Sequence, residues 1–198
     1  TEHATPGRPD IQFNVMPLSV DKPGTPLHRY SGFTASFWQC HPESRGTVHI
    51  QSPKHTTQPR INPNYLSTKL DQNVMVSGIK LLRKIHEQPA FRPLWNEETV
   101  IGGDTQSDLK ILEAIREMGG TVFHPVGTCR MGSDSSSVVD PQLRVRGVQG
   151  LRVIDASVMP KITSANTNAA TLMVGEKGAS MILKETNRRN SIMAEEIL

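Results

Sequence analysis

The sequence predicts an α+β fold, in which strands and helices occupy different parts of the chain. Stretches rich in β-branched and aromatic residues fall in the first third, at 33–39 and 47–51. Three stretches with apolar residues at helical spacing follow, at about 67–88, 107–118 and 169–184. These elements do not alternate strand by helix, as a complete doubly wound domain would require.

Length and composition favour one ordinary globular domain. The 198 residues are 36% hydrophobic and 21% charged, with 14 prolines and 15 glycines, which is typical of a soluble, loop-rich protein. The net charge of +3 is small and its cations are scattered, which argues against a nucleic-acid partner. No apolar run reaches membrane-spanning length. Cys40 and Cys129 form no disulfide framework, so we expect a reducing, cytoplasmic location.

Three of the predicted strands lie within the first 51 residues. Residues 1–29 are proline-rich and should form an extended arm, with one short strand at 11–15. Between the strands at 33–39 and 47–51, the run from Pro42 to Gly46 has the turn chemistry of a hairpin. The proline-containing stretch 52–66 is predicted to be an irregular connection.

The first two helices are predicted between about residues 67 and 118. The first helix should begin near Ser67 or Asp71 and end before Pro89. Ser107 can cap the second helix, which Gly119-Gly120 should end. Its apolar face is expected to comprise Leu109, Leu112, Ile115 and Met118.

The C-terminal stretch is predicted to contain a strand, a helix and a tail. The strand is expected at 151–154, and the helix should run from about Ala169 to Lys184, before a polar, frayed tail after Glu185. The apolar residues of this helix that we expect to face inward are Leu172, Met173, Ala179, Ile182 and Leu183.

His124 is the candidate proton-handling residue. The proline after it favours an extended backbone, and Gly127 permits a sharp turn, so the imidazole should be held firmly. An imidazole titrates near neutrality and can accept the proton of an alcohol that is losing hydride. From this segment alone, a core histidine satisfied by backbone groups fits equally well.

Two further segments have the chemistry to hold a redox cofactor. Asp155 follows the predicted strand at 151–154, a position where ribose or ribityl hydroxyls are bound, although taken alone an aspartate that caps the next turn is the simpler interpretation. The small, polar run from Thr163 to Thr171 leads into the last helix, whose positive end favours the negative charge of a reduced flavin. Ordinary helix capping also explains such runs.

Other chemistries lack a motif in this sequence. It contains no G-x-G-x-x-G dinucleotide loop, no G-x-S-x-G serine, no H-E-x-x-H and no phosphate-binding loop. His41, His49 and His55 have no cysteine or carboxylate at ligand spacing, so no metal site is predicted. If the chain contacts a dinucleotide, another segment must hold the adenosine end.

Three motifs follow one another in the last third of the chain. They are H-P-V-G-T-C-R-M-G from His124, L-R-V-I-D-A-S-V-M-P from Leu151, and N-T-N-A-A-T-L-M-V-G-E-K-G-A from Asn166. Their order resembles the C-terminal signature of the glucose-methanol-choline (GMC) flavoprotein oxidoreductases. The similarity extends upstream through P-E-S-R-G-T-V-H-I-Q-S and P-R-I-N-P-N-Y-L-S, and it covers about residues 33–184.

This resemblance implies a division of the chain into domains. A substrate-binding domain, an antiparallel sheet with helices packed on one side, would occupy residues 1–140, including an N-terminal arm at 1–30. Residues 141–185 would supply the last strand and helix of a Rossmann-like FAD-binding domain, followed by a tail at 186–198. The family's N-terminal part, with its glycine-rich loop, is absent from the sequence.

The resemblance also implies roles for individual residues. His124 would be the catalytic base or hydrogen-bond partner of the substrate hydroxyl, assisted by Asn166. Phe37 and Gln39 alternate on a strand that faces the substrate cavity in this family, although Phe37 is equally explained as a core residue. The positions that would contact FAD are Asp155 and Ala156 at its ribityl-pyrophosphate part, and Asn168, Ala169 and Thr171 at the pyrimidine edge of the flavin.

We therefore expect the C-terminal portion, or a small subunit, of an FAD-dependent alcohol oxidase or dehydrogenase that is choline dehydrogenase-like. The substrate would be a primary alcohol, with an aromatic one preferred, and activity would require a partner segment or subunit that carries the glycine-rich loop. One alternative is a non-catalytic structural or binding subunit of a heteromeric flavoprotein complex. Another is a fragment cleaved from a single-chain enzyme, because the chain begins at Thr1 without a methionine or a signal-peptide pattern. The electron acceptor is left open.

Overall fold

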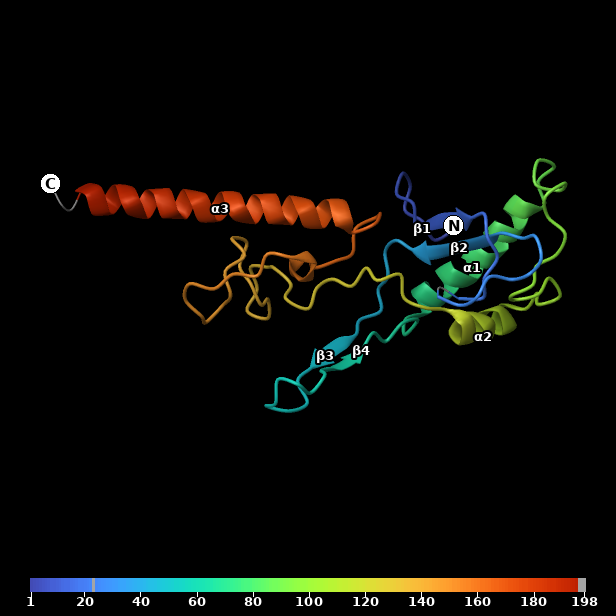
Figure 1. Ribbon diagram of the computed structural model, residues 1–198, viewed down its shortest axis with the longest axis horizontal. Helices are drawn as coiled ribbons and strands as arrows, with labels where there is room; N and C mark the ends of the chain where they lie inside the picture. The colour runs from blue at the N-terminus through green and yellow to red at the C-terminus, as the bar shows by residue number, and fades with distance from the viewer. Residues whose placement is uncertain (23, 196–198) are drawn as a thin grey trace. The chain divides into compact units, whose positions relative to one another are not determined.

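The structure, a computed structural model, describes residues 1–22 and 24–195 and confirms the α+β class (Figure 1). The chain divides into two compact units, Thr1–Val122 (unit 1) and Phe123–Leu198 (unit 2), which are described separately. The domain boundary predicted at residue 140 concerns the assembled enzyme and stays a prediction. Among the described residues, no helix combines the length and the apolar character needed to cross a lipid bilayer.

Unit 1 is built on an antiparallel strand pair packed against a helix. Strand β1 (Ile11–Met16) pairs with β2 (Thr34–Gln39), and β2 lies against α1 (Lys69–His86) (Figure 1). The approach is close because α1 has a glycine at the contact: a Cβ atom on Gly78 would lie 2.6 Å from Cζ of Phe37. These three elements confirm the strands predicted at 11–15 and 33–39 and the first predicted helix.

Helix α2 (Asp108–Met118) packs on α1 through a small buried cluster that includes Val76, Ile111 and Ile115. As predicted, Ser107 caps the helix, since its side chain accepts a hydrogen bond from the amide of Lys110 at 3.3 Å. The predicted apolar face was partly wrong. Leu109 is 66% exposed, whereas Ile111 is fully buried, because the face that meets α1 is centred on Ile111 and Ile115.

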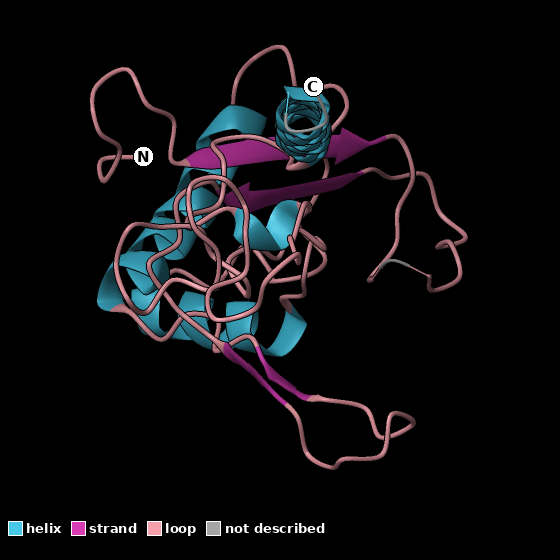
Figure 2. Ribbon diagram, turned by 90° about the vertical axis from the view of Figure 1, so that its left-hand side faces the viewer, coloured by secondary structure: helices cyan, strands magenta, loops and turns pink. Residues whose placement is uncertain are grey.

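The hairpin predicted between residues 33–39 and 47–51 is wrong. Strand β3 (Thr47–His49) pairs instead with β4 (Arg60–Asn62), inside the stretch predicted to be irregular (Figure 2). The residues of the predicted turn are held elsewhere, because the amides of Glu43 and Ser44 donate hydrogen bonds to Asp71 of α1. All six residues of the β3–β4 pair are exposed.

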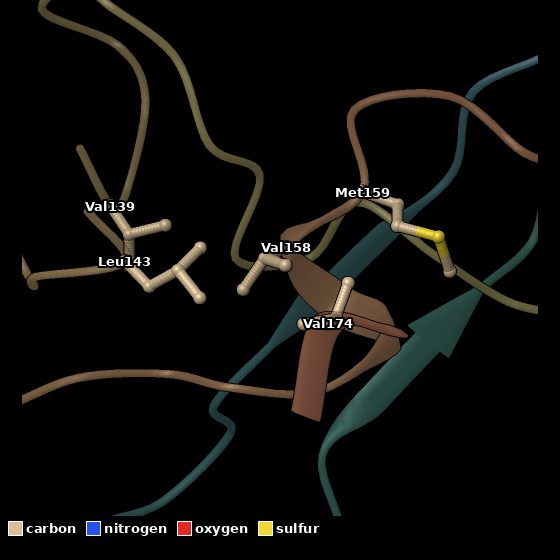
Figure 3. Close-up of a cluster of buried hydrophobic side chains, with 5 residues drawn as sticks. All are labelled: Val139, Leu143, Val158, Met159 and Val174. Atoms are coloured by element: carbon tan, nitrogen blue, oxygen red, sulfur yellow. The ribbon is translucent and has the colours of Figure 1, made fainter. Parts of the chain in front are cut away.

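Unit 2 has one long helix packed on irregular, hydrogen-bonded chain. Helix α3 (Asn168–Glu195) contacts the short 3₁₀ helix η1 (Ala156–Val158). Figure 3 shows the core of this unit, where Val158 lies between Leu143 of the preceding loops and Val174 of α3. The buried members of this cluster are Val139, Leu143, Val158, Met159 and Val174.

Two predictions for unit 2 need correction. Helix α3 continues to Glu195, past the predicted end at Lys184, so residues 186–195 are helical, and 196–198 lie outside the described residues. The stretch 151–154 is extended but pairs along one edge only, with the Val153 amide donating to the Leu143 carbonyl at 3.2 Å. A buried parallel strand needs a neighbour on each side, and no such strands occur among the described residues of this unit.

The inward face of α3 also differs from the predicted one. Leu172 and Leu183 are 64% and 63% exposed. The side that packs on unit 2 instead carries Ala170, Val174, Gly178 and Met181. The sequence places apolar residues on two sides of this helix. The side that contains Ala170 and Gly178 packs inward, because these small residues let the helix come close to its neighbours. The residues predicted inward that are exposed are Leu172, Met173, Ala179, Ile182 and Leu183.

Candidate active site

The structure brings His124 and Asn166 together within unit 2. The side-chain nitrogen Nδ2 of Asn166 lies 3.4 Å from Nε2 of His124, although 42 residues separate them in the chain. His124 is half-buried and Asn166 is exposed. The amide can donate to the unprotonated form of this imidazole nitrogen. An imidazole nitrogen and a neutral amide thus lie next to each other near the surface of the unit.

The loop that carries His124 is fixed at both ends of its turn. Phe123, just before it, has a φ of 58°, and Gly127 has a φ of 88°, so both adopt the left-handed conformation. Beyond the turn, the amide of Cys129 donates to the carbonyl of Ser157 at 3.1 Å, and that of Met131 to the carbonyl of Val158 at 2.8 Å. These bonds tie the His124 loop to η1, which packs on α3.

Asn166 is positioned by the start of α3. The buried Thr167 follows it, and the Thr167 carbonyl accepts hydrogen bonds from both the amide and the hydroxyl of Thr171, at 2.9 and 2.8 Å. Asn168 and Ala169 form the first exposed residues of the helix. Three of the predicted cofactor positions therefore lie on the first turn of α3, within five residues of Asn166. Their contact with FAD stays a prediction.

Asp155 acts as the cap of η1 in this chain. Its carboxylate accepts a hydrogen bond from the Ser157 amide at 2.8 Å and another from the Ser157 hydroxyl. Ala156 begins the 3₁₀ helix and packs against the core cluster. The capping interpretation of Asp155 is therefore realised here. Asp155 is exposed, so a further contact to a ligand hydroxyl is sterically open, and its cofactor role stays a prediction.

The predicted substrate residues belong to unit 1, where both make structural contacts. Phe37 lies against α1 and against the ring of Phe13, at a centroid distance of 5.8 Å. Gln39 donates a hydrogen bond from Nε2 to Oδ1 of Asp71 at 2.9 Å. These contacts agree with the core interpretation of Phe37. A role of either residue toward a substrate stays a prediction.

Sequence reasoning missed the structural role of Asp71, a buried carboxylate of unit 1. It is 1% exposed and accepts hydrogen bonds from Gln39, from the amides of Glu43 and Ser44 at 2.9 and 2.8 Å, and from the Ser44 hydroxyl. Burial alone would raise the pKa of Asp71, but these hydrogen bonds outweigh it and lower the pKa below its ordinary value. Thr68, three residues earlier, caps the same helix turn, and this Thr-x-x-Asp spacing is the signal that could have identified it.

The start of α3 has the chemistry to hold one edge of a flavin. The first amides of a helix point outward without helical partners, and the helix dipole favours negative charge there. The side chains beside these amides are small or neutral, so charge and space both suit a polar ring edge. Among the described residues, no group of three or more His, Cys, Asp or Glu side chains could hold a metal ion.

Comparison with known proteins decides the family. The family model described as GMC oxidoreductase matches residues 42–175, which is more than half of the chain. The chain belongs to the GMC oxidoreductase family.

Similar proteins come from both curated sequences and solved structures. An alcohol dehydrogenase [acceptor] from Pseudomonas putida is 40% identical over 180 residues, which are 91% of this chain and 33% of that protein. An oxygen-dependent choline dehydrogenase from Pseudomonas aeruginosa is 41% identical over 174 residues, or 88% of this chain and 31% of that protein. The crystal structure of pyridoxine 4-oxidase from Mesorbium loti matches with a TM-score of 0.81 and 31% identity, covering 88% of this chain and 34% of that one. The chain thus spans about a third of the length of its GMC relatives.

Proposed function

We propose that this chain is the C-terminal portion or a small subunit of an FAD-dependent alcohol oxidoreductase. The observation that carries the proposal is the pairing of His124 with Asn166, at 3.4 Å between Nε2 and Nδ2. Two polar groups at this spacing can bind the same hydroxyl oxygen, one as acceptor of its proton and one as donor to its lone pair. Both residues lie in the motifs that place the chain in the GMC family.

The proposed chemistry follows from the properties of the two side chains. His124 accepts the hydroxyl proton at Nε2, which requires the neutral imidazole with its proton on Nδ1. Asn166 orients the oxygen and cannot itself titrate, so it holds the alcohol in place without competing for the proton. The 3.4 Å contact between Nε2 of His124 and Nδ2 of Asn166 supports a base that is already directed toward the group that would orient the substrate.

FAD is the proposed cofactor because the start of α3 suits its pyrimidine edge. Asn168, Ala169 and Thr171 would lie along that edge, and Asp155 with Ala156 would contact the ribityl-pyrophosphate part. When bound, FAD supplies the hydride acceptor for the alcohol carbon. The chain has no glycine-rich dinucleotide loop, so the proposed partner is a segment or subunit that carries one.

The extended stretch 151–154 supports the proposal that residues 141–185 complete a Rossmann-like domain. One edge of this stretch pairs with residues 143–145, as in the bond from the Val145 amide to the Leu151 carbonyl at 2.9 Å. The backbone groups of Arg152 and Ile154 make no backbone hydrogen bond among the described residues. A strand of the partner could extend the sheet there.

A primary alcohol is the proposed substrate, since the relatives are named for an alcohol, choline and pyridoxine. The preference for an aromatic alcohol rests on Phe37 and is proposed on that basis alone.

Cys40 and Cys129 are both free thiols, which supports the proposed reducing, cytoplasmic compartment. The paired His124 and Asn166 argue against a purely structural subunit, which has no use for them.

Reconstitution tests this proposal. The chain is co-expressed with the remaining two thirds of the Pseudomonas putida alcohol dehydrogenase, and the complex is purified and its flavin absorbance recorded. We expect FAD to co-purify with the complex and not with the chain alone, and benzyl alcohol or choline added without oxygen to bleach the oxidised flavin. A complex that retains FAD but is bleached by no primary alcohol would support the non-catalytic subunit instead.

A further inference from the structure

Helix α3 has a second apolar side, which the core of unit 2 leaves exposed. The core contacts the helix at Val174 and Gly178, on the side where the loops of unit 2 lie (Figure 1). On another side, apolar and small residues recur at helical spacing. The members of this outer stripe are Leu172, Gly175, Ala179, Ile182 and Leu183. Leu172 and Leu183 are 64% and 63% exposed, and contiguous exposed apolar surface marks interaction sites.

Gly175 lies within the outer stripe, and nothing in the described part of the chain requires a glycine there. A Cβ atom at this position would meet no atom within 4 Å, and the residue lies inside the helix, where alanine is more stable. Gly178, on the inner side, differs because Ile154 packs directly against it. A neighbour from outside this chain that comes equally close to α3 would explain Gly175 in the same way.

The outer stripe borders a hollow of about 670 Å³ on unit 2. Ile182 of the stripe lies on one wall, and the apolar residues Val148 and Leu151, each about half exposed, lie on another. The charged pair at the hollow is satisfied inside the unit, since Arg152 contacts Glu185 at 2.5 Å. The hollow therefore offers a partner mainly apolar surface, and well-packed proteins fill such space with side chains.

We propose that the outer stripe and this hollow form the docking surface for the FAD-binding segment of a GMC enzyme. The chain spans 33% of the Pseudomonas putida alcohol dehydrogenase, so about two thirds of that protein is available to cover the surface. The stripe begins directly after Thr171, a proposed flavin contact, and the hollow includes Arg152, whose backbone has no hydrogen bond among the described residues. An element packed there would therefore lie beside the cofactor that it helps to bind. The inference rests on the proposed function.

Three variants of the stripe and its border test the surface in the chain alone. Leu183→Gln removes an apolar side chain from the stripe, and Gly175→Ala adds a Cβ atom to it. Lys184→Gln is the control, because Lys184 is exposed and adjacent in sequence but lies off the stripe. In urea unfolding, Leu183→Gln should keep the wild-type midpoint and Gly175→Ala should not lower it. A clearly lower midpoint in Leu183→Gln would show that the chain's own residues cover the stripe, and would overturn the proposal.

The deciding measurement uses the complex with the rest of the Pseudomonas putida alcohol dehydrogenase. Analytical ultracentrifugation over a dilution series gives its dissociation constant. We expect Leu183→Gln and Gly175→Ala each to raise this constant at least about 10-fold, and Lys184→Gln to change it less than about 3-fold. Gly175→Ala would then weaken the complex without destabilising the chain, which a residue that acts only on the fold of the chain would not do.

Three results would overturn the proposal. They are an unchanged dissociation constant in both stripe variants, no complex with the wild-type chain, and a dimer of the chain alone that Leu183→Gln abolishes, which would make a second copy the occupant. Flavin reduction separates this inference from the proposed function. If both variants weaken the complex but no primary alcohol reduces the wild-type flavin, only the proposed function fails. If alcohol reduces the flavin and both variants bind as tightly as wild type, only this inference fails.

Discussion

Gly178 of α3 lies against the side chain of Ile154, so closely that a Cβ atom at position 178 would approach the Ile154 Cδ1 to 2.9 Å. Gly178 is buried, and Ile154 belongs to the partly buried residues around the core of unit 2. The absence of a side chain at 178 therefore determines how near α3 comes to the extended stretch that precedes η1.

Replacing this glycine should destabilise unit 2. Gly178→Ala would force Ile154 or the helix to move, and overpacking of this kind costs roughly 1–3 kcal/mol. Gly175→Ala is a matched control, because a Cβ there would meet nothing within 4 Å, so the better helix propensity of alanine should stabilise by up to about 1 kcal/mol. Urea unfolding followed by circular dichroism measures both. Equal effects of the two substitutions would contradict the packing described for Gly178.

Asp71 should be the most important buried polar side chain of unit 1. Asp71→Asn replaces one acceptor oxygen by a donor that faces the donors of Gln39 and Ser44, which should cost about 2–3 kcal/mol of unfolding free energy. Asp108→Asn is the control, since Asp108 pairs with Lys80 on the surface and should contribute less than about 1 kcal/mol. Differential scanning calorimetry compares the two. A loss of stability in Asp71→Asn no larger than in Asp108→Asn would show that the carboxylate does not hold the 43–44 segment.

The pH dependence of stability should identify the same residue. Because the pKa of folded Asp71 is lowered from its ordinary value of 3.8, its contribution is fully present above that value. The contribution should be lost as the pH falls through the lowered pKa of the folded state. Unfolding free energies of wild type and Asp71→Asn should therefore converge in acid and diverge toward neutral pH. A difference that does not vary with pH would contradict this assignment.

Local patterns were sufficient to predict the helices and the positions of β1, β2 and β3, but not β4. Ser107 and the glycines after Met118 marked both ends of α2, because capping depends on residues a few positions apart. The pairing of β3 with β4 was missed because it depends on Asp71, which holds the 43–44 segment away from a hairpin turn. Such a contact joins residues far apart in the chain and leaves little local signal.

The residues of the candidate site could be predicted from motifs, but their contacts depend on residues far apart in the chain. His124 and Asn166 were selected through ordered motifs, and their proximity could only be confirmed once the chain was folded. The side of α3 that faces the core was predicted wrongly. Periodicity alone allows two apolar sides, and the one that packs inward is the one where Gly178 leaves room for Ile154. The unusual φ of Phe123 has no signature in the sequence, since phenylalanine does not favour it.

The rate of flavin reduction by alcohol in His124→Ala tests the central proposal most directly. The FAD complex of this variant is mixed with benzyl alcohol in a stopped-flow instrument without oxygen, and the loss of oxidised flavin is compared with wild type at equal FAD content. If His124 accepts the hydroxyl proton, the rate should fall by about 10²- to 10⁴-fold, while FAD remains bound. A rate within a few-fold of wild type would show that His124 is not the base, and would contradict the proposal.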